Sequence, residues 1–190
     1  MNKSELRRIY LAKQKSLSGV EREEKSQKIA DGFFGKFSLE GIRFLHVFLA
    51  IEKNGEIETS FIYKQLWTQF PEITTIVSRV NFQTMTLEHL KFITDTKLAR
   101  NRWQIFEPTG NELIEIEKID VCLVPLLCFD ERGFRVGYGK GFYDKFLSEC
   151  RTDCVKIGLS YFEPTAEIAD AQDYDVKLDY CITPEKIWKL

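Results

Sequence analysis

Apolar residues recur every three or four positions at the start of the chain and predict two consecutive helices. In the first, which extends to about Leu17, Leu6 and Tyr10 share one face. The second turns a set of apolar side chains inward: Ile29, Phe33, Phe34 and Phe37. Each helix is preceded by a capping side chain with a glutamate three residues later, which satisfies free backbone N–H groups at a helix start. The two pairs are Asn2 with Glu5 and Ser18 with Glu21.

Short apolar runs follow and predict strands at residues 43–50, 73–80, 120–128, 155–159 and 178–183. Helical patterns lie between them, at 59–70 and just after residue 141. Strands that alternate with helices favour right-handed crossovers and a parallel sheet. We therefore expect a Rossmann-like, three-layer α/β/α fold with a mainly parallel central sheet, and a single domain over residues 1–190. Residues 81–93 are ambiguous between a short strand and a turn of helix, and 107–110 resemble a turn or loop.

Composition narrows the class of protein. Hydrophobic residues make up 44% of the chain and charged residues 29%, as in globular proteins. The net charge of −2 gives no overall basic footprint for nucleic acid, so any anion site must be local. No apolar run reaches the length of a membrane helix, and no signal peptide is apparent. The five cysteines form no zinc pattern. We expect free thiols in a cytoplasmic, monomeric protein.

Four of the eleven glycines lie between Gly133 and Gly141, together with Arg135 and Lys140. Glycines let backbone N–H groups approach an anion, and the helix predicted just beyond them adds free N–H donors. The segment matches neither the Walker A pattern nor the dinucleotide fingerprint. Its residues alone are compatible with a phosphate-binding loop and equally with a plain glycine-rich turn.

The run from Arg135 to Asp144 (RVGYGKGFYD), with Pro125 and Phe129-Asp130 before it, resembles the signature of the 5-formyltetrahydrofolate cyclo-ligase family. Further blocks agree in order along almost the whole chain: Lys3 to Arg7 (KSELR), Phe48-Leu49, Glu56 to Thr59, Trp103 before Glu107-Pro108, and Asp175 to Asp179. Val136 replaces the usual leucine, Phe142 stands where tyrosine is usual, and Tyr138 occupies a variable position.

The resemblance implies ATP-dependent closure of 5-formyltetrahydrofolate to 5,10-methenyltetrahydrofolate, with release of ADP and phosphate. It places Arg135 and Lys140 on the transferring phosphoryl group. It places these residues on ATP: Lys3, Ser4, Glu5, Leu6, Arg7, Arg135, Val136, Gly137, Tyr138, Gly139, Lys140, Gly141, Phe142 and Tyr143. It places these on the folate: Leu49, Glu56, Trp103, Tyr138, Gly139, Lys140, Gly141 and Phe142. It makes Asp144 and Asp175 ligands of Mg²⁺. His46 and His89 lie outside every matching block, and we expect both to be structural.

Other interpretations stay open at the level of sequence. Lys3 and Arg7 could form a solvated basic face, Asp144 could stabilise a helix N-terminus, and Asp175 could belong to a turn. Trp103 is as compatible with the core as with a ligand contact. For the whole chain, the alternatives are a nucleotide- or folate-binding module without turnover, and a sugar-phosphate enzyme of similar fold.

Overall fold

The computed structural model describes residues 1–110 and 112–190. Its helices are α1 (Lys3–Ser16), α2 (Gly19–Lys36), α3 (Ser60–Gln69) and α4 (Phe142–Glu149), with short 3-10 turns η1 (Glu52–Asn54) and η2 (Ile116–Lys118). Both expected capping boxes are present, at Asn2 for α1 and at Ser18 for α2. Among the described residues, no helix is long and apolar enough to cross a membrane.

Seven strands form the central sheet, in the order β11-β10-β9-β6-β1-β2-β3. They are β1 (Phe44–His46), β2 (Thr74–Asn81), β3 (Thr86–Lys91), β6 (Val121–Pro125), β9 (Val155–Leu159), β10 (Tyr180–Ile182) and β11 (Ile187–Lys189). The five strands from β10 to β2 pair in parallel, and β3 and β11 add antiparallel edges. The mainly parallel α/β architecture expected from the sequence is thus confirmed.

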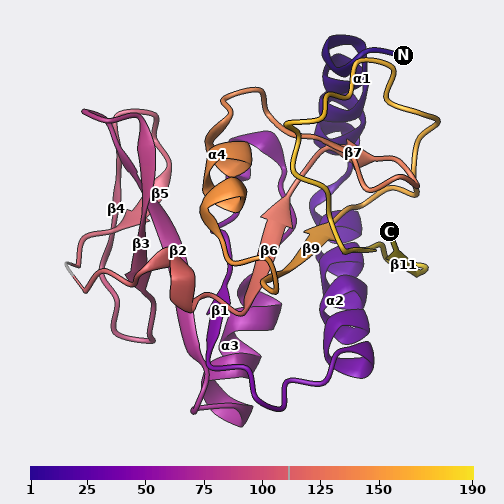
Figure 1. Cartoon of the computed structure of the whole chain (residues 1–190). Helices are drawn as coiled ribbons and strands as arrows, with labels where there is room; N and C mark the ends of the chain where they lie inside the picture. Colours follow the sequence, from indigo (N-terminus) through magenta and orange to yellow (C-terminus); the bar gives the residue numbers. More distant parts are fainter. Residues whose placement is uncertain (111) are drawn as a thin grey trace.

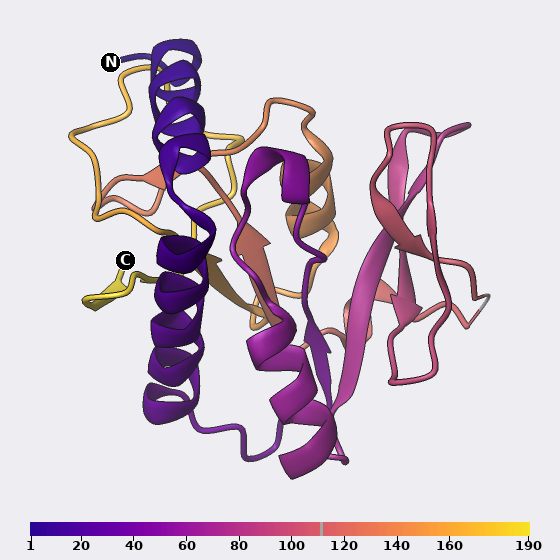
Figure 2. The same ribbon diagram turned by 180° about the vertical axis from the view of Figure 1, so that it is seen from behind.

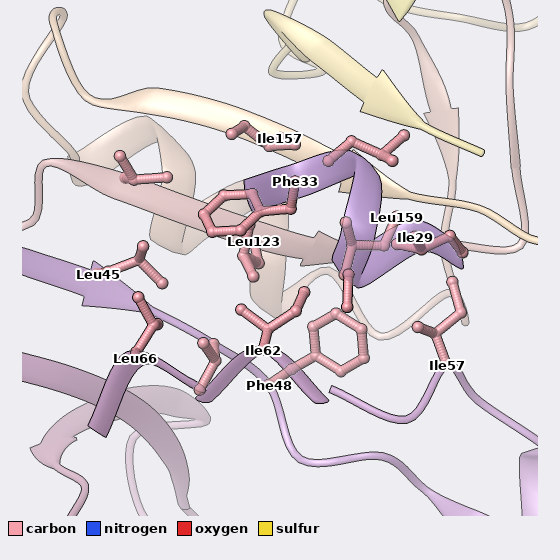
Figure 3. Packing of buried hydrophobic residues seen from close by; sticks show 14 of the residues in the cluster. Ile29, Phe33, Leu45, Phe48, Ile57, Ile62, Leu66, Leu123, Ile157 and Leu159 are labelled. Carbon is pink, nitrogen blue, oxygen red and sulfur yellow. The ribbon is translucent and has the colours of Figure 1, made fainter. Parts of the chain in front are cut away.

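Helices cover both faces of this sheet, as Figure 1 and the reverse view in Figure 2 show. On one face, α2 and α3 bury Phe33, Ile62 and Leu66 against Leu45 and Leu123 of the inner strands. Figure 3 shows these side chains interdigitating. All five are at most 1% exposed, and burial of such side chains stabilises the fold by about 1.5–3 kcal/mol each. This face therefore anchors the strands whose carboxyl ends carry the cavity described below.

The other face is covered by α4, which packs Phe146 and Leu147 onto Cys122 and Val124 of β6. A smaller cluster joins α1 to the two-stranded ribbon of β7 (Cys128–Phe129) and β8 (Arg135–Val136). In that cluster, Leu6 is fully buried beside Val136. This packing places the start of α1 next to the glycine-rich segment.

The structure differs from the sequence expectation mainly between residues 81 and 110. Here β2 turns into β3, and a separate ribbon forms from β4 (Leu98–Arg100) and β5 (Phe106–Pro108). Of the two interpretations of 81–93, the short strand is confirmed by β3, and the turn of helix is wrong because this antiparallel strand follows a turn after β2. The expected loop at 107–110 is also wrong at its first two residues, which belong to β5. The strand expected over 43–50 ends at His46, and Phe48 and Leu49 beyond it line the cavity.

Candidate functional site

A cavity of about 490 Å³ opens at the carboxyl ends of β1 and β6, where open parallel sheets usually bind ligands. The segment after β1 supplies Leu49, and Pro125 ends β6. The start of α1, the glycine-rich segment and the two ribbons of β2–β5 complete the wall. Lys53 of η1 donates a hydrogen bond to the carbonyl of Trp103 at 2.8 Å, which joins two of these walls. The volume is typical of sites that bind a small organic molecule or a cofactor.

The two glycines of the segment that lie nearest to α4 have backbone angles that a side chain would strain. Gly139 has a φ of +83°, and a Cβ there would lie 3.0 Å from the guanidinium carbon of Arg7. Gly141 has a φ of +74° and caps α4 without a side-chain hydrogen bond. The N–H groups of the first turn of α4 are therefore available to an anion, and Arg7 approaches the loop closely. Arg7 also donates to the carbonyl of Gly137 at 2.9 Å.

Two ion pairs lie at this end of the cavity. Arg135 donates to a carboxylate oxygen of Asp144 at 2.6 Å and to the carbonyl of Val176. Lys3 donates to a carboxylate oxygen of Asp175 at 2.5 Å. Each pair joins a cation expected to bind phosphate with an aspartate expected to bind metal. All four side chains line the same cavity. Positive and negative charges therefore lie together at the end of the cavity where the family resemblance implies phosphate and Mg²⁺.

Lys140 is exposed at the cavity mouth, with its ammonium 5.9 Å from the centre of the Trp103 ring. The Trp103 ring is half-buried and also faces Phe142, at 6.1 Å between ring centres. Both rings line the cavity, so Trp103 belongs to the wall and not to either main core cluster. Together, the two rings and Lys140 give this part of the wall apolar surface and one exposed positive charge.

Glu56 is the most perturbed carboxyl group in the cavity wall. Burial raises its pKa to about 7, although the backbone N–H of Ile51 and the side chains of Tyr138 and Asn54 donate to the carboxyl and oppose that rise. Gln14 of α1 in turn donates to the Tyr138 hydroxyl at 2.9 Å. Glu56 therefore carries a mixture of charged and neutral forms near neutral pH, held in a fixed orientation by these donors.

We expect Glu56→Gln to stabilise the protein at pH 8 and not at pH 4. The raised pKa means that the folded state holds the proton more tightly than the unfolded state, whose pKa is near 4.5. That stabilisation is complete below about pH 4.5 and is lost as the pH rises through 7. Replacing the ionisable carboxyl group should thus raise the free energy of unfolding at pH 8 by up to about 3 kcal/mol more than at pH 4. Thermal unfolding of wild type and variant at both pH values measures this difference, with the exposed Glu52→Gln as the control. An equal change in stability at pH 4 and pH 8 would contradict the raised pKa of Glu56.

Glu107 of β5 also faces the cavity, and the sequence analysis gave it no role. Its side chain is buried and accepts a hydrogen bond from the backbone N–H of Val80 at 2.9 Å. Further wall residues were missed as well: Phe48, Ile51, Lys53, Asn54, Ser78, Val80, Leu87, Ile105, Phe106 and Pro125. Three of them, Leu87, Ile105 and Phe106, come from the segments between residues 81 and 110 that the pattern did not resolve. Phe48, Glu107 and Pro125 lay in blocks that matched the family, and this was the signal that could have indicated them.

The structure brings almost all the expected site residues to this one cavity. The exceptions are three neighbours in α1: Ser4 and Glu5 are exposed, and Leu6 is in the core. Glu5 instead accepts from the backbone N–H of Asn2 in the capping box. In this part of the chain only Lys3 and Arg7 present side chains to the cavity, as residues four positions apart on one helix face do.

Both histidines are buried beneath α4 and are not part of the cavity wall. Burial lowers the pKa of His46 well below its usual value and that of His89 to about 4. The centre of the His46 ring lies 4.9 Å from that of Phe146, with the two planes tilted by 55°, and its Nε2 lies 2.8 Å from the Ser78 hydroxyl. Both rings are therefore neutral at physiological pH, consistent with the structural role expected for them.

Sequence comparison identifies relatives over most of the chain. The profile of the 5-formyltetrahydrofolate cyclo-ligase family matches residues 1–184. The 5-formyltetrahydrofolate cyclo-ligase of Escherichia coli strain K12 is 30% identical over 146 residues, which cover 75% of this chain and 79% of that protein. The protein of the same name from Mycoplasma pneumoniae is 28% identical over 186 residues, 97% of this chain and all (100%) of that one.

Solved structures agree with this relationship. A 5,10-methenyltetrahydrofolate synthetase from Mycoplasma pneumoniae superimposes with a TM-score of 0.76 at 25% identity and covers 97% of this chain and 99% of its own. The enzyme of that name from Aquifex aeolicus gives 0.82 at 26% identity and covers 100% of this chain and 93% of its own. Sequence and fold therefore lead to one conclusion: the chain belongs to the 5-formyltetrahydrofolate cyclo-ligase family.

Proposed function

We propose that this protein uses ATP to convert 5-formyltetrahydrofolate to 5,10-methenyltetrahydrofolate, releasing ADP and phosphate. The observation that carries the proposal is the convergence, in one cavity, of a helix N-terminus, a glycine-rich loop and four cations. The cations are Lys3, Arg7, Arg135 and Lys140. Such a set favours a polyphosphate, because N–H donors and positive charges both stabilise phosphate oxygens.

The formyl group of the substrate is an amide, whose carbon is a poor electrophile. In the proposed reaction, the formyl oxygen attacks the γ-phosphorus of ATP, the bond to the bridging oxygen breaks, and ADP leaves. The formyl carbon is then activated as an iminium phosphate. Phosphoryl transfer of this kind depends on in-line positioning and charge neutralisation. Arg135 and Lys140 would supply that neutralisation, while Lys3 and Arg7 would hold the rest of the triphosphate.

The remaining wall suits a folate. Glu56 would accept hydrogen bonds from the amino edge of the pterin, held ready by the N–H of Ile51 at 2.9 Å. Leu49, Trp103 and Phe142 give apolar and aromatic surface for the ring system. Tyr138 would act mainly through Glu56, since its hydroxyl hydrogen-bonds to that carboxyl group.

Asp144 and Asp175 are the residues that would hold Mg²⁺. No group of three or more candidate ligands is preformed among residues 1–110 and 112–190, but Mg²⁺ commonly uses one or two carboxylates together with phosphate oxygens and water. Both aspartates offer hard oxygen donors at the end of the cavity where the cations gather. When bound there, the ion would offset negative charge on the transferring phosphoryl group.

The activity can be tested directly. We expect purified protein, Mg-ATP and 5-formyltetrahydrofolate together to produce methenyl product, followed by its near-ultraviolet absorbance, with one ADP formed per product. No product should form when nucleotide is omitted. Binding of folate and ATP without turnover would instead support a binding module. Product formation without ATP would overturn the nucleotide part of the proposal.

A further inference from the structure

The proposed reaction, on which this inference rests, leaves one proton without an acceptor. N10 of the substrate is a secondary amine and carries a hydrogen, whereas N10 of the methenyl product carries none. When the N10 lone pair forms the bond to the activated formyl carbon, the N–H becomes acidic and must lose its proton. A fixed acceptor within hydrogen-bond reach accelerates such a step.

The carboxyl groups of the cavity wall differ in how many ion pairs and hydrogen bonds they already make. Asp144 and Asp175 are ion-paired with Arg135 and Lys3 at the end that would receive phosphate. Glu56 accepts from the backbone N–H of Ile51 and from two side chains. The histidines, the usual proton acceptors in enzymes, lie outside the wall.

Glu107 is the remaining carboxyl group of the cavity. Among the described residues, its side chain makes one hydrogen bond, from the Val80 N–H to Oε1, and no ion pair. Pairing of β5 with β4 fixes its backbone, because Glu107 lies opposite Ala99 in the ribbon. The hydrogen bond from Val80 fixes Oε1 of the carboxyl group. The second oxygen is thereby held in place and remains free to accept a proton. Trp103, four residues earlier, also lines the cavity and gives it aromatic surface.

We propose that Glu107 is the general base of the cyclisation step and takes the proton from N10. As the N10–carbon bond forms, the N10 hydrogen passes to the free carboxylate oxygen of Glu107. Electron density from the two nitrogens then expels phosphate, the carbon–oxygen bond breaks, and the amidinium product remains. Glu107 afterwards returns the proton to solvent. Phosphoryl transfer from ATP precedes this step and does not involve Glu107.

The order of events gives a specific test. In single-turnover quench experiments, we expect Glu107→Gln to form ADP at close to the wild-type rate but to form methenyl product about 10²-fold more slowly. The amide oxygen of Gln can still accept from Val80, so the variant keeps the local fold while losing the base. Glu112→Gln is the matched control: its carboxylate is 3.1 Å from Lys91, its side chain is 65% exposed, and both steps should stay at wild-type rates.

Each outcome decides the proposal. Equal rates of product formation in wild type and Glu107→Gln would overturn it, as would equal slowing of ADP and product formation. If Glu107→Gln does not fold, Glu107→Asp decides instead: slower cyclisation with unchanged ADP formation supports a displaced base, and any other pattern contradicts it. Failure of the wild type to form product would reject the proposed function itself, a separate result.

Discussion

Replacing Lys140 with alanine is expected to lower kcat by on the order of 10³-fold while leaving the thermal stability close to that of the wild type. The side chain is exposed, and its ammonium lies 5.9 Å from the centre of the Trp103 ring, so its removal costs the folded state little stability. The lost charge would otherwise act on the transferring phosphoryl group, and one preorganised donor is worth about 10²- to 10³-fold in rate. Steady-state kinetics with saturating ATP and folate measure the change.

Lys145→Ala is the matched control for this experiment. Lys145 is exposed like Lys140 and lies on α4, three residues beyond the first residue of the helix, but it is not part of the cavity wall. Its removal should leave kcat within about twofold of wild type, as surface substitutions usually do. A Lys140→Ala variant with turnover as fast as that of Lys145→Ala would remove Lys140 from the mechanism.

The sequence predicted the parallel part of the fold well because that part is locally encoded. A strand buried on both faces, such as β6, appears as a continuous apolar run, and α1 and α2 show their caps and periodicity directly. The ribbon of β4 and β5 carries no such signal. All three residues of β4 are exposed, so its strand character comes from pairing and not from an apolar pattern.

The site, too, could be predicted only where it is encoded by neighbouring residues in the sequence. The glycine-rich loop is contiguous, so its residues and their proximity to a helix start could be predicted together. The pair of Lys3 and Asp175 joins residues 172 positions apart, and no local pattern indicates that the two side chains meet. Glu107 was missed for a similar reason: its hydrogen bond to Val80 and its place in the wall follow from the packing of β5 against β2.

Arg135→Ala should reduce kcat by on the order of 10³-fold and also destabilise the fold moderately. The Arg135 side chain is only 5% exposed and donates to both Asp144 and the carbonyl of Val176, so its loss leaves two acceptors without their donor. Asp144 is 46% exposed and can be rehydrated, which limits the cost to about 1–3 kcal/mol. Arg135→Lys should keep most of the stability but little of the rate, because an ammonium cannot hold both acceptors and still present a planar face to phosphate.

Arg132→Ala separates the catalytic part of this effect from the structural part. Like Arg135, Arg132 joins two acceptors, here the carboxylates of Asp130 at 2.8 Å and Glu167 at 2.6 Å, but it is not part of the cavity wall. Because Asp130 is 2% exposed, losing Arg132 should cost at least as much stability as losing Arg135. We expect its kcat at a temperature where both variants are folded to stay within about threefold of wild type. If the two variants lost activity in proportion to their lost stability, Arg135 would be a structural clamp between α4 and Val176, and phosphoryl transfer would depend on the other cations alone.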